Sequence, residues 1–245
     1  MPTAQSGSVG TMSTDDMLQT VRAGTAFFET QLDGLSNEEL SEPSLLPAWT
    51  RAHVVAHVGY NAVAIARLVS WAETGVETPM YASREARDEE IAVAASWEPD
   101  ALRQLSANSA LLLDSAWRHL PDQRWAAEVQ TAQGRLVAAS ETIWMRTREV
   151  WVHAVDLNTA ASFGDMPTAV LDRILGDVVA SWATRGEDVG LRLEASDAGA
   201  YGDGSTPDPL IVSGDLAALT AWACGRAGAA VAFNRDGFPV APRWL

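Results

Sequence analysis

Residues 140–157 constrain the fold of this chain more than any other stretch of the sequence. Their apolar and polar positions recur at the spacing of an α-helix, and Glu149 and His153 are four residues apart. Both side chains therefore project from one face of that helix. A carboxylate and an imidazole are two of the ligands that divalent zinc prefers. The stretch predicts a helix that carries half of a metal site.

A second helix supplies candidates for the other half of the site. Thr50 is a good N-cap, and His53 and His57 follow one turn apart. Catalytic zinc takes three protein ligands and keeps a fourth position open for water or substrate. Either histidine would complete the set with Glu149 and His153. Two histidines on a mostly apolar helix also fit simple core packing.

Charge and basic composition exclude several functions. The 245 residues carry a formal net charge of -15 at pH 7, with a sequence pI near 4.5. Nucleic acid and anionic membranes are repelled by such a field. All 17 basic residues are arginine, which excludes Schiff-base chemistry on a lysine and a P-loop lysine. An anionic small-molecule substrate would need a local cluster of arginines.

Cys224 is the only cysteine, so neither an intramolecular disulfide nor a cysteine-based zinc cluster can form. It is either a nucleophile or a buried, inert thiol. No stretch reaches the roughly 18 to 20 uninterrupted apolar residues of a membrane span, and the N-terminus lacks the apolar region of a signal peptide. We therefore expect a soluble cytoplasmic protein, and the sequence does not indicate its oligomeric state.

Helical patterns dominate the first two thirds of the chain, and a mixed pattern follows Pro167. The expected elements are a helix capped by Ser13 that closes near Gly34, a helix from Thr50 to Gly75, a short surface helix or lid at 83–90, a helix from Asp100 to Pro121, an exposed hairpin or loop around Gln133 and Gly134, the helix at 140–157, a helix at 168–184, strands at 191–195 and 210–213, and a helix from Asp215 through Ala229.

These elements predict a mainly α protein with an N-terminal four-helix bundle and a small C-terminal α+β domain. The expected divisions are a disordered N-terminus at residues 1–12, the metal-binding bundle at 13–164 and the α+β domain at 165–245. Bundles of this kind build metal sites from facing helices.

Several phrases resemble the mycothiol-dependent maleylpyruvate isomerase family, from about residue 15 to the C-terminus. They are WTRAHVVAH at 49–57, ETPMY at 77–81, TAQGR at 131–135, SET at 140–142 running to REVWVHAVDL at 148–157, and PRWL at 242–245. The resemblance implies a DinB-like four-helix bundle that binds a divalent zinc ion, followed by a small sterol-carrier-like domain.

The resemblance also implies site residues. It places the metal ligands on His57, Glu149 and His153, and it leaves His53 as a neighbouring packing or cofactor-binding residue. Asp156, three residues after His153, either orients the free ring nitrogen of that histidine or is a surface carboxylate.

Two arginines are candidates for binding anionic groups. The resemblance marks Arg226 as catalytic, because an arginine fork suits the carboxylates of a dianionic substrate and the charge that develops on it. Arg87 is a further cofactor-binding candidate from the charged run, and its alternative is a solvated charge.

The family reaction is the cis-trans isomerisation of maleylpyruvate to fumarylpyruvate in gentisate breakdown, with the low-molecular-weight thiol mycothiol as cofactor. A thiolate must add to the conjugated alkene so that a single bond can rotate before elimination. A free thiol has a pKa near 8.5, whereas a metal-coordinated thiol is deprotonated. The implied cofactors are therefore zinc and mycothiol. Two alternatives remain, a mycothiol S-transferase of the same bundle family and a non-enzymatic metal-binding module.

Overall fold

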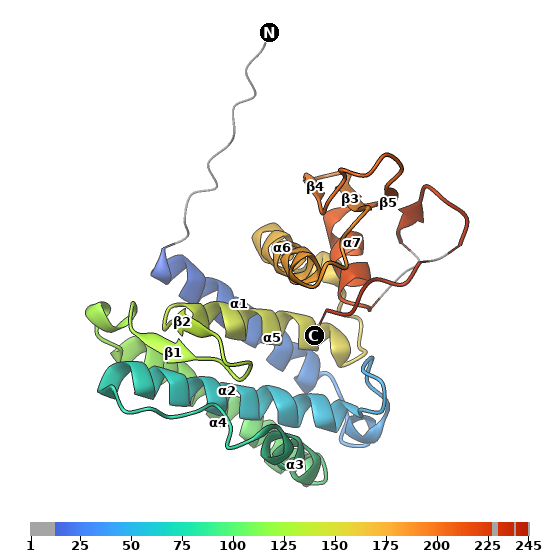
Figure 1. Ribbon diagram of the computed structural model, residues 1–245. Coiled ribbons are helices and arrows are strands. Elements are labelled where there is room, and N and C mark those ends of the chain that lie inside the picture. Colours follow the sequence, from blue (N-terminus) through green and yellow to red (C-terminus); the bar gives the residue numbers. More distant parts are fainter. Residues whose placement is uncertain (1–12, 227–229, 238, 245) are drawn as a thin grey trace. The chain divides into compact units, whose positions relative to one another are not determined.

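The first helix, α1 (Thr14–Asp33), begins where its capping residues predict (Figure 1). The Ser13 hydroxyl accepts a hydrogen bond from the Asp16 N–H, and the Asp16 carboxylate accepts one from the Ser13 N–H. The computed structural model describes residues 13–226, 230–237 and 239–244. The predicted disorder of residues 1–12 lies outside the described residues.

The remaining bundle helices also begin and end close to their expected positions, and this confirms the predicted N-terminal four-helix bundle. They are α2 (Arg51–Thr74), α4 (Pro99–His119) and α5 (Glu141–Asp156), with the short α3 (Arg84–Ala94) between α2 and α4. Ser83 caps α3, so the charged run forms a helix, as expected. Short 3-10 turns lie at Glu39–Ser41, Asp122–Arg124 and Phe163–Asp165.

The expected hairpin precedes α5. Strands β1 (Glu128–Gln130) and β2 (Leu136–Ala138) pair in antiparallel register, with Val129 opposite Val137. Gly134 has a φ of 81°, a left-handed conformation that glycine adopts without strain. The turn therefore lies where the Gln133-Gly134 pair predicts it.

Helix α2 forms the centre of the bundle core. Within the described part of the chain it alone has the length and composition of a membrane span, and 78% of its most apolar window is buried. Its Ile65 and Leu68 join one cluster with Leu113 and Trp117 of α4. The Trp117 indole N–H donates to the Thr142 hydroxyl at 3.0 Å. The apolar surface of α2 is thus that of a core helix.

The C-terminal part is a small α+β unit, which confirms the expected class. It contains α6 (Thr168–Arg185), β3 (Leu191–Ala195), β4 (Ala200–Tyr201), β5 (Leu210–Gly214), α7 (Leu216–Ala223) and β6 (Ala232–Phe233). The sheet order is β4-β3-β5-β6, with β3 and β5 parallel and both outer strands antiparallel to their neighbours. Trp182 of α6 and Trp222 of α7 meet edge to face, with their ring centroids 6.1 Å apart.

The last helix is shorter than the sequence predicts. Helix α7 ends at Ala223, with Cys224 as its cap, instead of continuing through Ala229. Gly225 has a φ of 73°, the left-handed conformation that typically ends a helix. Ala229 lies outside the described residues.

The chain divides into two compact units, residues up to 41 with 52–150, and residues 42–51 with those from 151 onward. The division falls inside α5, which is one continuous helix. The predicted domain boundary at residue 164 stays a prediction.

Candidate metal centre

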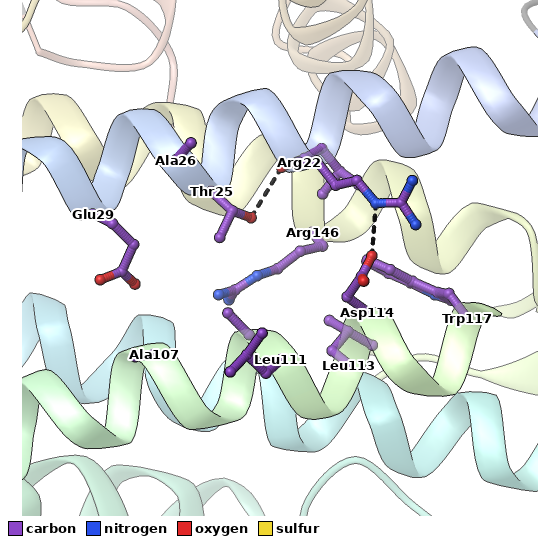
Figure 2. Close-up of a pocket in the computed structure, with 12 residues that line it drawn as sticks. Arg22, Thr25, Ala26, Glu29, Ala107, Leu111, Leu113, Asp114, Trp117 and Arg146 are labelled. Atoms are coloured by element: carbon purple, nitrogen blue, oxygen red, sulfur yellow. Dashed lines mark hydrogen bonds and ion pairs between the residues drawn. The ribbon is translucent and has the colours of Figure 1, made fainter. Parts of the chain in front are cut away.

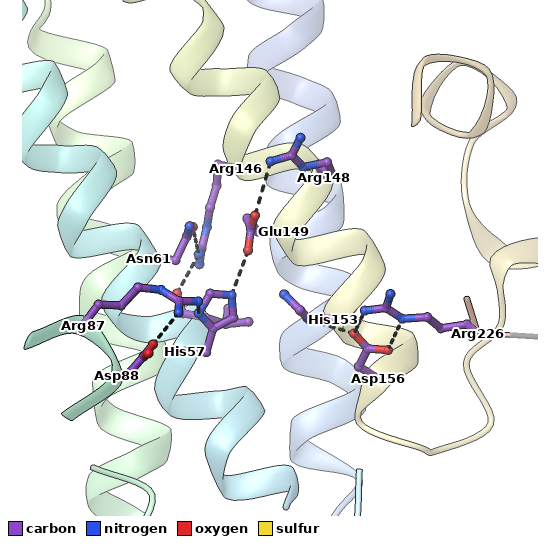
Figure 3. Close-up of polar contacts among 11 residues, drawn as sticks. His57, Asn61, Arg87, Asp88, Arg146, Arg148, Glu149, His153, Asp156 and Arg226 are labelled. Atoms are coloured by element: carbon purple, nitrogen blue, oxygen red, sulfur yellow. Dashed lines mark hydrogen bonds and ion pairs between the residues drawn. The ribbon is translucent and has the colours of Figure 1, made fainter. Parts of the chain in front are cut away.

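His57 and Glu149 bring α2 and α5 together at the candidate centre (Figure 3). His57 Nε2 lies 2.9 Å from Glu149 Oε2, and only 7% and 14% of the two side chains are exposed. The residues are 92 positions apart in the sequence. A carboxylate cannot donate, so Nε2 carries the proton of this hydrogen bond.

Arg51, the first residue of α2, ties that helix to the end of α5. Its Nε donates to the Leu157 carbonyl at 2.7 Å and its Nη2 to the Asn158 carbonyl at 2.9 Å. Nη1 pairs with Glu42 at 2.7 Å. The first residue of α2 is therefore held by the two residues that follow α5.

Three donor residues meet at the centre. His57, Glu149 and His153 each offer one ligand atom, and these atoms lie within 4.8 Å of one another. Glu149 and His153 are separated by one turn of the continuous α5, so their common direction follows from helix geometry. Two imidazoles and a carboxylate are a typical donor set of catalytic zinc. The residues present therefore fit a divalent zinc ion.

Asp156 holds His153 in the tautomer that a metal ligand needs. His153 Nδ1 lies 2.8 Å from Asp156 Oδ2, so Nδ1–H donates and Nε2 keeps its lone pair. Asp156 is fully buried, and Arg226 Nε and Nη2 each donate to it at 3.0 Å. Burial alone would raise the pKa of Asp156, but the hydrogen bonds and charges of His153 and Arg226 bring it below its ordinary value.

Arg87 lies on the other side of His57. Its Nη2 is 3.3 Å from His57 Nδ1, its Nη1 pairs with Asp88 at 2.7 Å, and its guanidinium carbon is 5.9 Å from the Tyr81 ring centroid. Burial raises the pKa of Tyr81 to about 12, and the charge of Glu149 adds to the effect. The structure thus brings Arg87 and the neutral Tyr81 phenol to the metal-donor group.

His53 and Cys224 are not metal donors. His53 is half-buried one turn before His57 and lies outside the group of three donors. Cys224 is a buried thiol at the end of α7, as the inert alternative expects. Arg226 contacts Cys224 only through the backbone in this hydrogen bond, in which Arg226 Nη1 donates to the Cys224 carbonyl at 2.5 Å.

Arg146 is a buried arginine on the helix that carries two of the donors, and the sequence did not predict its burial. Its side chain is 2% exposed, and Nη1 donates to the Val58 carbonyl at 2.6 Å and to Asn61 Oδ1 at 2.9 Å. The sequence feature that could have pointed to Arg146 is its position three residues before Glu149, which places it on the same helix face as both α5 donors.

The bundle and its donors define a class of protein, a helical bundle with a candidate divalent-metal centre built from facing helices. The family model for the mycothiol maleylpyruvate isomerase N-terminal domain matches residues 21–158, more than half of the chain. The chain belongs to the mycothiol maleylpyruvate isomerase family.

Two solved structures support the same family over 95% of the chain. The crystal structure of a mycothiol-dependent maleylpyruvate isomerase aligns at 44% identity with a TM-score of 0.92, covering 95% of this chain and 98% of that one. A variant with a histidine replaced by alanine aligns with the same values. A Bacillus subtilis protein, YfiT, described as a probable metal-dependent hydrolase, aligns at 16% identity with a TM-score of 0.49, over 61% of this chain and 89% of that one. No curated protein sequence matches the chain significantly.

Proposed function

We propose that this chain is a mycothiol-dependent isomerase that converts maleylpyruvate to fumarylpyruvate. The observation that supports this most directly is the 44% identity to such an isomerase over 95% of the chain. A shared metal site would account for likeness in the bundle alone, whereas the alignment also covers the C-terminal unit. The proposal includes a cytoplasmic location and a role in gentisate breakdown.

We assign the metal ligands to His57, Glu149 and His153. A zinc ion held there would lower the pKa of the mycothiol thiol and keep the thiolate beside the alkene. The protein's part is to present both imidazoles through Nε2. Asp156 does this for His153 by accepting the hydrogen bond from Nδ1–H.

Metal ligation would also change the role of Arg87. A guanidinium only donates, so His57 Nδ1 is the acceptor in the present contact and Nε2 carries the proton. A neutral imidazole that ligates through Nε2 carries its proton on Nδ1 instead. Arg87 would then lose that acceptor, and its charge would turn to an anionic group of the thiol or the substrate. This supports Arg87 as a cofactor-binding residue.

Arg226 remains the proposed catalytic arginine. Addition of a thiolate to the dianionic substrate pushes negative charge onto the oxoacid end, where an arginine stabilises it. The two hydrogen bonds from Arg226 to Asp156 hold the guanidinium in a fixed orientation. Preorganised donors of this kind lower the cost of charge development.

The test is the absorbance-monitored turnover of maleylpyruvate by the purified, zinc-saturated protein, with and without mycothiol. We expect fumarylpyruvate only when the thiol is present. His57→Ala and Glu149→Gln should lose zinc and activity together, whereas Glu73→Gln, an exposed glutamate elsewhere on α2, should retain both. Full activity of a metal-free Glu149→Gln protein would contradict the zinc mechanism.

The alternatives predict different results in the same assay. Zinc binding without isomerisation, but with thiol conjugation to added electrophiles, would identify a mycothiol S-transferase. Tight zinc binding with no thiol-dependent turnover of any electrophile would leave a non-enzymatic metal-binding module.

A further inference from the structure

A cavity opens in the bundle between α1 and α4, and Arg146 of α5 lines it (Figure 2). Its volume is about 410 Å³, within the range of small-molecule sites. The walls are mainly apolar and include Val21 of α1 with Leu113 and Trp117 of α4. None of the three metal donors lines it. It is therefore a space separate from the donor group.

The Arg146 guanidinium points into this cavity (Figure 2). Nη1 has two acceptors on α2, the Val58 carbonyl and Asn61 Oδ1. In the part of the chain that the structure describes, Nε and Nη2 have no acceptor, although the side chain is 98% buried. Arg146 lines the cavity, so a ligand or water in that space can accept from these N–H groups.

The charge of Glu29 acts on Arg146 through space and raises its pKa against the effect of burial, but among the described residues no hydrogen bond or ion pair joins the two side chains. Arg22 and Asp114 pair with each other at 2.7 Å. Glu29 accepts from the Ser106 hydroxyl at 2.6 Å, and burial raises the pKa of its carboxyl group. Burial lowers the pKa of Arg146 to about 10, so the guanidinium stays charged at neutral pH. The cavity thus presents a cation whose N–H groups are available.

We propose that this cavity binds a small carboxylic acid with an apolar chain, its carboxylate on Nε and Nη2 of Arg146 and its chain between α1 and α4. The Nε and Nη2 groups of a guanidinium form the fork that matches a carboxylate. The apolar walls would bury the rest of the ligand. The site does not depend on the proposed isomerase activity, because it uses neither the metal donors nor a thiol.

Calorimetric titration of the zinc-saturated full chain with sodium octanoate tests the proposal. We expect saturable binding to one site, with affinity rising about fourfold per methylene from butanoate to octanoate, because each buried methylene adds a constant apolar contribution. Octanol and octylamine should bind about tenfold more weakly or worse, since they cannot accept the charge-assisted pair of hydrogen bonds. Octanol binding as tightly as octanoate would overturn the role of Arg146.

Two neighbouring positions on α4 give a matched pair of variants. Ala107 lines the cavity and Asn108 does not, and both are exposed. Ala107→Phe should place its ring in the cavity and lose most octanoate binding, whereas Asn108→Phe should bind as the parent does. Equal binding by the two variants would overturn the proposal. This comparison leaves the buried Arg146 unchanged, so the fold is not put at risk by replacing it.

The metal centre is the competing location for a carboxylate. Octanoate binding should be the same in zinc-saturated and chelator-treated protein, with maleylpyruvate turnover followed in parallel. Binding that needs zinc would place the carboxylate on the metal and would overturn the second site. This outcome leaves the isomerase proposal intact, so the two can fail separately.

Discussion

Asp156 supports the candidate metal centre although it is not among the three ligand residues. The carboxylate is fully buried and is held by His153 on one side and by Arg226 on the other. A buried carboxylate without such partners would be costly, and the pKa of Asp156 instead lies below its ordinary value. The charge that these partners maintain fixes the proton of His153 on Nδ1.

Asp156→Asn should weaken zinc binding by about 10-fold to 100-fold, the usual effect of losing the partner of a ligating histidine. The amide keeps an oxygen for Nδ1–H, but it removes the negative charge and turns N–H groups toward Arg226. Competition with a chromophoric chelator measures the affinity. Asp100→Asn, on the exposed first turn of α4, is the control. Unchanged zinc affinity in Asp156→Asn would show that the carboxylate does not orient the ligand.

Glu29 gives a prediction for the pH dependence of stability. Burial raises its pKa above the ordinary 4.5, so the folded chain keeps this proton to a higher pH than the unfolded chain. The folded state then binds more protons, and the free energy of unfolding falls as pH rises from 4.5 through the raised pKa. Glu29→Gln should remove this fall.

Urea unfolding at a series of pH values from 4 to 7 measures the effect. The stability of Glu29→Gln relative to the parent should increase toward pH 7, because the parent alone pays for ionising a buried carboxyl group. A difference that stays constant over this range would mean that Glu29 titrates alike in both states.

At the scale of elements, capping residues and glycines in the sequence were enough to predict where the long helices begin and end. Ser13 with Asp16 fixed the start of α1, and Gly75 ended α2, because caps and left-handed glycines act within a few residues. Strands β4 and β6 are two residues long, too short for a period of two to be visible.

The candidate site was only partly readable from the sequence. The spacing of Glu149 and His153 showed two donors on one face, but His53 and His57 are also one turn apart, so spacing alone left both open. The contact between His57 and Glu149 joins helices that are distant in the sequence. Arg146 was missed because arginines are mostly exposed, and its burial depends on acceptors on α2.

Two helical glycines provide a test of how tightly α2 packs near the site. A Cβ on Gly59, two residues after His57, would lie 2.7 Å from Leu105 Cγ, whereas a Cβ on Gly176 of α6 would meet nothing within 4 Å. Gly59→Ala should therefore destabilise the protein by about 1–2 kcal/mol, since overpacking exceeds the gain in helix propensity. Gly176→Ala should stabilise it by about 0.5–1 kcal/mol.

Thermal unfolding of the two variants measures these shifts. The control is internal, because both substitutions make the same chemical change inside a helix. Stabilisation by Gly59→Ala would mean that Leu105 moves aside without cost and that the contact between α2 and α4 is loose.

At the scale of the whole molecule, the net charge of -15 opposes the approach of a dianion. The bundle counters this locally, because its arginines gather at the donor group. Arg87 contacts His57, and Arg148 Nη2 lies 3.7 Å from Glu149. An acidic protein thus presents positive charge at the one place where the proposed substrate needs it.

Removal of zinc should lower the stability of the whole protein. His57 and Glu149 are 92 residues apart and approach each other only in the folded chain, so zinc at this site binds the folded state alone. At a free zinc concentration of about 100 times the dissociation constant this adds about 2.7 kcal/mol, equivalent to about 5–10 °C in Tm for a chain of this size. Differential scanning calorimetry with zinc and with chelator measures the shift.

Glu149→Gln, which lacks a ligand, should unfold at the same temperature in both conditions. A zinc-dependent rise in Tm of the same size in that variant would locate the stabilising ion somewhere other than the centre formed by His57, Glu149 and His153.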